Sequence, residues 1–187
     1  MITQPPAIIP LETSEAAPSR LASLFMRLVT RSASETRQFG CRLGERLIPG
    51  DVICLSGDLG AGKTTLTQGI AAGWGALDAV SSPTFVLVNE YARADGARLW
   101  HLDCYRLTTG AEALALGLDD LLDAAQGTPG GALVIEWPEH ILEALPADRL
   151  TVRLASTDLD TRLVTLEPRG DRPTALARLL AGEASRA

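Results

Sequence analysis

Lys63 is the only lysine in this chain of 187 residues, and it lies in the run GDLGAGKT at residues 57–64. The run fits the pattern G-x-x-x-x-G-K-[ST], in which backbone N–H groups surround the phosphates of a nucleotide. The other 16 basic side chains are arginines, so this one position keeps a compact ammonium where a planar guanidinium would not substitute. The pattern predicts that Lys63 reaches the β- and γ-phosphates and that the Thr64 hydroxyl ligates Mg²⁺.

The residues on either side of this run supply the strand and the helix that a phosphate-binding loop needs. Residues 51–56 (DVICLS) form a short apolar run that is typical of a buried parallel strand, and residues 63–74 have the apolar spacing of a helix. A strand, a glycine loop and a helix N-terminus in this order aim several N–H groups and the positive end of a helix dipole at one point. Gly60 and Gly62 let the backbone approach phosphate oxygens without a Cβ in the way. A glycine-rich turn with no ligand is the alternative.

Two acidic residues end apolar segments that are typical of strands. Asp103 ends residues 97–103 (ARLWHLD), and Glu136 ends residues 132–136 (ALVIE). In an open α/β sheet both carboxylates would project at the carboxyl edge, so either one can hold Mg²⁺ while the other orients a water molecule. Both are therefore candidate catalytic and metal-binding residues, the alternative being solvated acids at strand ends. His101 lies on the same strand face as Asp103, and we expect it to hydrogen-bond or orient rather than to transfer protons.

The segment SSPTF at residues 81–85 lies where many phosphate-loop proteins sense the third phosphate. We expect Thr84 to approach Mg²⁺ or the γ-phosphate in the triphosphate state and to release it after hydrolysis. The alternative is a Ser-Pro loop that only leads into a strand. Trp137 and Pro138 directly follow Glu136, and they are either packing residues or a surface for a partner.

The whole pattern predicts an α/β protein of the P-loop NTPase fold, with a mostly parallel central sheet, an antiparallel hairpin and helices on both faces. Residues 1–24 are rich in Pro, Ala and Ser without periodicity, so we expect a disordered tail before a single P-loop domain at residues 25–187. Ser32 and Glu35 give a capping-box signal for the first helix. The expected strands are residues 25–30, 51–56, 84–91, 97–103, 132–136, 150–154 and 163–166, and the expected helices are residues 33–47, 63–74, 111–124 and 174–181, with a short helix after Pro138.

The composition favours a cytoplasmic protein. The chain has 46% apolar residues, no apolar run of the roughly 18 residues that a membrane span needs, and no signal-peptide pattern at its start. Its three cysteines are widely spaced, which favours reduced, mostly buried thiols over a disulfide framework or a metal site. A net charge of −6 argues against a protein that binds nucleic acid with its whole surface, so we expect any role with RNA to be indirect or local.

Four sequence blocks in a fixed order carry a family resemblance. They are GDLGAGKTT at residues 57–65, SSPTFVLVNEY at 81–91, HLDCYRL at 101–107 and VIEWPE at 134–139. Together they resemble the TsaE family, the small bacterial ATPases of tRNA threonylcarbamoyladenosine synthesis, over roughly residues 28–170. The combination of HxDxYRL with IEWPE is far more specific than the phosphate-loop pattern alone. The chain departs from the family in its long N-terminal tail and in Cys104, where the family tends to have a larger apolar residue.

The resemblance implies a set of roles for single residues. ATP or ADP would be bound by Gly60, Ala61, Gly62, Lys63, Thr64 and Thr65. Thr64 and Glu136 would lie at Mg²⁺, and Asp103 would be needed for hydrolysis. Ser32, at the first helix cap, is our candidate for a contact to the base. The resemblance also implies two partner proteins, TsaB and TsaD, with tRNA reached only indirectly through that complex, and no membrane.

Other nucleotide-dependent functions differ from this one in their sequence requirements. A GTPase needs an N-K-x-D box, which a chain whose only lysine is Lys63 cannot contain. A small P-loop kinase acting on a small-molecule acceptor stays open, although Arg93, Arg98 and Arg106 form no evident lid block. A nucleotide-gated binding module, whose slow hydrolysis only resets a complex, is close to what the resemblance implies. Turnover that needs the partner pair would distinguish this module from a kinase.

Overall fold

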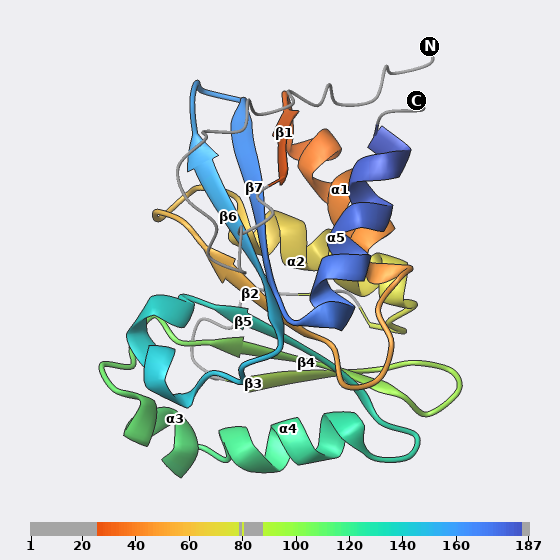
Figure 1. The fold of residues 1–187 in the computed structure, drawn as a ribbon, viewed down its shortest axis with the longest axis vertical. Helices are drawn as coiled ribbons and strands as arrows, with labels where there is room; N and C mark the ends of the chain where they lie inside the picture. Colours follow the sequence, from red (N-terminus) through yellow and green to blue (C-terminus); the bar gives the residue numbers. More distant parts are fainter. Residues whose placement is uncertain (1–25, 79, 81–87, 185–187) are drawn as a thin grey trace, which may run out of the picture.

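The computed structural model describes residues 26–78, residue 80 and residues 88–184, which form a seven-stranded sheet with helices on both sides (Figure 1). The strands are β1 (Met26–Thr30), β2 (Val52–Ser56), β3 (Val88–Ala92), β4 (Arg98–Asp103), β5 (Gly131–Glu136), β6 (Arg149–Ser156) and β7 (Arg162–Arg169). Their order across the sheet is β1-β7-β6-β2-β5-β4-β3.

The strand directions confirm the expected mixed sheet. Strands β6, β2, β5 and β4 form three consecutive parallel pairs. Antiparallel pairs flank them, with β3 against β4 at one edge and β7 between β6 and β1 at the other. Five of the seven strands therefore run in one direction, and the expected hairpin is present as β3 and β4.

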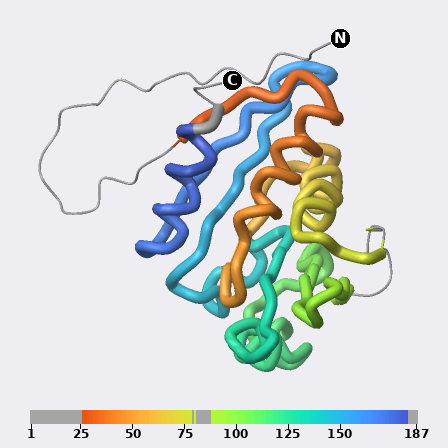
Figure 2. Tube along the Cα trace, turned by 90° about the vertical axis from the view of Figure 1, so that its right-hand side faces the viewer, coloured from red at the N-terminus to blue at the C-terminus, as the bar shows by residue number. Residues whose placement is uncertain are grey.

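The central strands are buried on both faces, which explains their unbroken apolar sequences. In β2, Ile53 and Leu55 point into the core under α1 (Ala33–Gly44), α2 (Lys63–Trp74) and α5 (Asp171–Ala184). Val52 and Cys54 point into a second core under α3 (Gly110–Ala115), α4 (Leu118–Gln126) and the 3₁₀ helix η1 (Pro138–Ala144). Figures 1 and 2 show the two sets of helices on opposite sides of the sheet. Helices on both faces are thus confirmed.

The pair α1 and α2 packs so closely that only glycine fits at several contacts. A Cβ added to Gly73 would lie 1.9 Å from the Cys41 carbonyl oxygen, and one added to Gly44 would lie 2.0 Å from the Ile70 carbonyl oxygen. The helix backbones therefore touch directly. This contact fixes α2, and with it the loop that precedes α2, against the rest of the molecule.

Some expected boundaries differ from the observed ones. The helix expected to reach residue 47 ends at Gly44, and the segment expected as one helix at residues 111–124 is two helices, because Gly117 takes a left-handed φ of 87° between them. The closing helix is longer than expected, at Asp171–Ala184. The expected tail at residues 1–24 and the first part of the strand expected at 84–91 lie outside the described residues.

The Ser32 cap of α1 is confirmed. Its side chain accepts a hydrogen bond from the Glu35 backbone N–H at 3.1 Å. The Glu35 carboxylate turns back to the N–H of Arg31, one residue earlier than in an ideal capping box. None of the helices in the described ranges is both long enough and apolar enough to pass through a membrane.

Candidate active site

The loop between β2 and α2 exposes open backbone at the start of a helix. Gly62 is the N-terminal cap of α2 with φ 102° and makes no side-chain cap, and Gly60 has φ 80°. A Cβ built on either glycine would meet no atom within 4 Å, so both face open space. The first N–H groups of α2 and the positive end of its dipole point toward this space. Open backbone at a helix N-terminus is what phosphate binding requires.

Lys63 is folded back onto its own loop. Its Nζ donates hydrogen bonds to the carbonyl oxygens of Gly57, at 2.6 Å, and of Asp58, at 3.0 Å. The side chain is buried, and burial lowers the pKa of the Lys63 ammonium, while Glu136 and other nearby carboxylates oppose this shift. The ammonium is thus held beside the open glycines by acceptors that a phosphate can replace.

The two candidate acids lie side by side. Asp103 ends β4 and Glu136 ends β5, and the two residues are register partners in this parallel pair. The expectation that both meet at the carboxyl edge of the sheet is confirmed. Burial raises the pKa of the Asp103 carboxyl group, and Glu136 raises it further, against a hydrogen bond from the Tyr105 N–H at 3.0 Å that lowers it.

Glu136 is held in place through one of its oxygens. Its side chain is almost fully buried, and Oε1 accepts hydrogen bonds from Thr67 Oγ1 at 2.9 Å and from His101 Nε2 at 3.0 Å. Both donors sit on the same oxygen, so Oε2 is left without a hydrogen bond in the part of the chain that the structure describes. Glu136 also lines a cavity beside the glycine loop.

His101 has the hydrogen-bonding role that its position predicts. Because Nε2 faces a carboxylate oxygen, it is the nitrogen that carries the proton. Nδ1 is buried and has no hydrogen-bond partner among the described residues. Through this hydrogen bond the His101 ring orients the Glu136 carboxylate.

Aromatic side chains close one side of the site. Trp137 follows Glu136 with a φ of 58°, a left-handed conformation that is uncommon for residues other than glycine. Lys63 Nζ lies 3.5 Å from the centroid of the Trp137 ring, and the Tyr105 ring lies 5.0 Å from it. The Trp137 N–H donates to the Leu55 carbonyl oxygen in β2, which fixes the backbone of this residue to the sheet.

The glycine loop, Lys63, the two acids and the two aromatic rings surround one cavity of about 310 Å³. The cavity is lined by Leu59, Gly60, Gly62, Lys63, Thr64, Thr65, Asp103, Tyr105, Glu136 and Trp137. Seven of the residues expected from the sequence are therefore brought together: Gly60, Gly62, Lys63, Thr64, Thr65, Asp103 and Glu136.

Two expected residues, Ala61 and Ser32, are not among those that line this cavity. Ala61 is buried beneath the loop, and Ser32 uses its hydroxyl to cap α1. Thr84 lies outside the described residues. Sequence reasoning missed Thr67 and Tyr105, although both positions carried a signal: Thr67 follows Lys63 by one helical turn, and Tyr105 lies two residues after Asp103.

The side chains of the site fit Mg²⁺ together with a nucleotide. The candidate ligands are the Thr64 hydroxyl and the two carboxylates, all of them the hard oxygen donors that Mg²⁺ prefers. Within the described ranges, no group of three or more His, Cys, Asp or Glu side chains is placed to hold a metal without other ligands. A metal here would therefore need oxygens from phosphate or water, which is the usual situation for Mg²⁺ at nucleotide sites.

Fold and site together define a class: a mixed α/β protein with a phosphate-loop motif between a central strand and its helix, opposite two strand-end carboxylates. Within this class the chain belongs to the TsaE family. The model of that family, described as "Threonylcarbamoyl adenosine biosynthesis protein TsaE", matches residues 30–164. The sequence resemblance to the family is confirmed.

Individual relatives are similar over most of their length. A protein named tRNA threonylcarbamoyladenosine biosynthesis protein TsaE from Streptomyces coelicolor is 41% identical over 152 residues, which cover 78% of this chain and 99% of that protein. A protein of the same name from Bacillus subtilis is 42% identical over 125 residues, 66% of this chain and 73% of the relative. The crystal structure of Bacillus subtilis YdiB superposes with a TM-score of 0.69 at 33% identity, covering 86% of this chain and 97% of that one.

Proposed function

We propose that this protein is a P-loop ATPase that binds ATP and ADP with Mg²⁺ and serves the synthesis of threonylcarbamoyladenosine on tRNA. The single observation that carries the nucleotide part is the cavity in which the glycine loop meets Asp103 and Glu136. The tRNA part is supported by membership of the TsaE family and by the names of the relatives.

The glycine loop and Lys63 would bind the phosphates. The open N–H groups at the start of α2 donate to phosphate oxygens, and the Lys63 ammonium exchanges the Gly57 and Asp58 carbonyls for the β- and γ-phosphates. After this exchange the ammonium is paired with the phosphate oxygens, where negative charge develops during hydrolysis.

The two acids would have different roles, one in metal binding and one in orienting water. Oε2 of Glu136, oriented through Thr67 and His101, is available to the metal together with the Thr64 hydroxyl. Asp103, its neighbour across the strand pair, is placed to orient the attacking water. Bound Mg²⁺ would supply positive charge at the phosphates and order their oxygens.

The nucleotide state would act as a switch on partner proteins. We place TsaB and TsaD as those partners, with tRNA contacted only through their complex, and a cytoplasmic location follows from this role. Three residues are candidates for a conformational change that depends on the γ-phosphate and that a docked partner can recognise. They are Trp137 and Tyr105 at the cavity and Thr84 in the segment outside the described residues.

Substitution of Lys63 tests the nucleotide site. Lys63→Ala should weaken ADP binding in calorimetric titration and lower ATP hydrolysis roughly 100-fold or more, measured with and without TsaB and TsaD. Lys63→Arg should fail as well, because the wider guanidinium does not fit the space between the loop and Trp137. Arg178→Ala, on the exposed surface of α5, is the control and should match the wild type.

Full turnover by Lys63→Arg would contradict the assignment of this loop. Transfer of the γ-phosphoryl group from ATP to a small-molecule acceptor, without any need for the partner pair, would instead support a kinase.

A further inference from the structure

The side chain of Arg162, the first residue of β7, joins the glycine loop to the loop between β6 and β7. Its Nε donates a hydrogen bond to the Ala61 carbonyl oxygen at 3.0 Å. Its Nη1 lies 3.1–3.2 Å from the carbonyl oxygens of Asp158, Leu159 and Thr161. One guanidinium thus ties together two segments that are 101 residues apart in the chain.

The bond to Ala61 controls the orientation of a peptide unit in the glycine loop. The Ala61 carbonyl and the Gly62 N–H belong to the same planar trans unit, so they point in opposite directions. With the carbonyl held by Arg162, the Gly62 N–H is directed to the other side, where Gly62 lines the cavity. In the described residues this N–H has no acceptor, whereas the Ala61 N–H is satisfied within the loop by the Asp58 carbonyl.

We propose that Arg162 is a positioning residue for phosphate binding: it holds the Ala61–Gly62 peptide so that the Gly62 N–H faces the phosphates before they arrive. A charged donor on the carbonyl also polarises the peptide unit and makes its N–H a stronger donor. The inference rests on the proposed nucleotide site, but it concerns a residue outside the sequence motif that defines the site.

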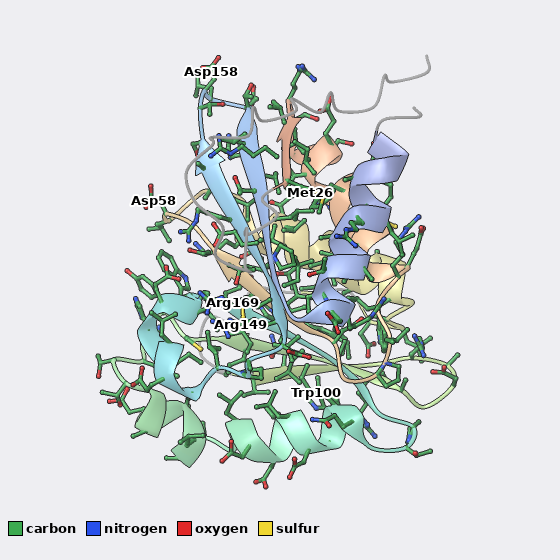
Figure 3. All side chains as sticks on the ribbon, in the orientation of Figure 1. Met26, Asp58, Trp100, Arg149, Asp158 and Arg169 are labelled. Carbon is green, nitrogen blue, oxygen red and sulfur yellow. The ribbon has the colours of Figure 1, made fainter. Side chains whose placement is uncertain are left out.

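The contacts of Arg162 require a guanidinium in particular. The Nε and Nη1 donors point in different directions from one rigid plane, so one side chain serves the glycine loop and the β6–β7 loop together. A lysine at this position would keep the charge but could not serve both. Figure 3 shows the two loops on the same side of the molecule, where Asp58 and Asp158 are labelled, and Arg169 at the opposite end of β7.

The test compares Arg162→Gln and Arg162→Lys with the wild type in calorimetric titrations of Mg²⁺-pyrophosphate and Mg²⁺-ADP. Both variants should bind both ligands about tenfold more weakly, which corresponds to about 1.4 kcal/mol. In the wild type, pyrophosphate should move the Gly62 amide proton downfield in NMR spectra, and both variants should lose this shift. Arg169→Gln, an exposed arginine on the same strand, should keep wild-type affinity and the shift.

Each outcome bears on the proposal. Wild-type affinity in Arg162→Gln overturns it. If only Arg162→Lys keeps wild-type affinity, the proposal is also overturned. The positive charge at this position, and not the orientation of the peptide, would then determine the affinity. If the glutamine variant does not fold, the lysine variant and its amide spectrum carry the test. A wild-type protein that binds neither ligand overturns the proposed function together with this inference, whereas wild-type binding with unchanged variants overturns the inference alone.

Discussion

The two faces of the sheet are covered in different ways. Where α2 meets α1, a Cβ on Gly73 would lie 1.9 Å from the Cys41 carbonyl oxygen, so one helix backbone rests on the other. Where α3 meets η1, a Cβ on Gly110 would first meet side-chain atoms of Ala144 and Glu143, at 2.9 Å. The Glu143 side chain can rotate away from such a contact, whereas the Ala144 Cβ and a helix backbone can move only with the main chain that carries them.

This contrast indicates which half of the cavity the fold holds in place. The glycine loop leads directly into α2, which begins at Lys63. The close backbone packing of α2 on α1 therefore also holds the loop and Lys63 in place. Tyr105 and Trp137 belong to connections that lead to α3 and η1 on the second face. We infer that the phosphate-receiving half is rigid and that adjustment to nucleotide or partner takes place in the aromatic half.

The largest effects are expected at the acids, where the two halves meet. Glu136→Gln should weaken Mg²⁺-dependent nucleotide binding, whereas Asp103→Asn should reduce hydrolysis more than binding. Either loss removes roughly 2–4 kcal/mol of transition-state stabilisation. ATP turnover and ADP titration, each with and without Mg²⁺, measure the two effects. Asp123→Asn, an exposed acid on α4, is the control. Wild-type turnover and metal-independent affinity in both variants would refute these roles.

Matched glycine substitutions test the comparison of the two faces directly. Gly73→Ala should lower the free energy of unfolding by about 2–3 kcal/mol, since the clash with a backbone outweighs the better helix propensity of alanine. Gly110→Ala should lower it by less, about 1–2 kcal/mol, because Glu143 can move aside with the loss of its hydrogen bond to the Gly110 N–H, and only the end of η1 at Ala144 must shift. Gly182→Ala in α5, where a Cβ meets nothing within 4 Å, should be neutral or stabilising.

Urea denaturation of the three glycine variants measures these differences. If Gly73→Ala and Gly110→Ala lower the free energy of unfolding equally, the two faces do not differ in rigidity. The inference that adjustment takes place in the aromatic half would then be wrong.

The unit from β2 to α2 was predictable because its signals are local. An apolar run, three glycines and an apolar helical face follow one another within 25 residues, and the helix has the expected bounds, Lys63–Trp74. The break at Gly117 was harder, because a glycine inside a helical pattern is tolerated as often as it ends a helix.

The contacts that orient the site depend on the tertiary fold and have weak sequence signals. Asp103 and Glu136 were expected at one edge, but their direct pairing follows from β4 lying next to β5. The Thr67 bond to Glu136 joins residues 69 positions apart. Arg162 is one of 16 arginines, and nothing in its neighbours distinguishes it until β7 is placed beside the glycine loop.

The smallest expected effect is a pH dependence of stability that reports the burial of Asp103. Burial raises the pKa of this carboxyl group above its ordinary value of 3.8, so the folded protein holds the proton more tightly than the unfolded chain does. As the pH rises from the unfolded pKa through the folded one, the unfolded chain binds fewer protons than the folded protein, and the free energy of unfolding falls. Asp103→Asn cannot titrate and should escape this loss, so its stability relative to the wild type should increase from acid to neutral pH. Urea unfolding of both proteins across this range, with EDTA present to exclude bound metal, measures the difference. Parallel stability curves would show that Asp103 is as solvated in the fold as in the unfolded chain, and a relative loss for the variant would mean that a partner stabilises the ionised carboxylate.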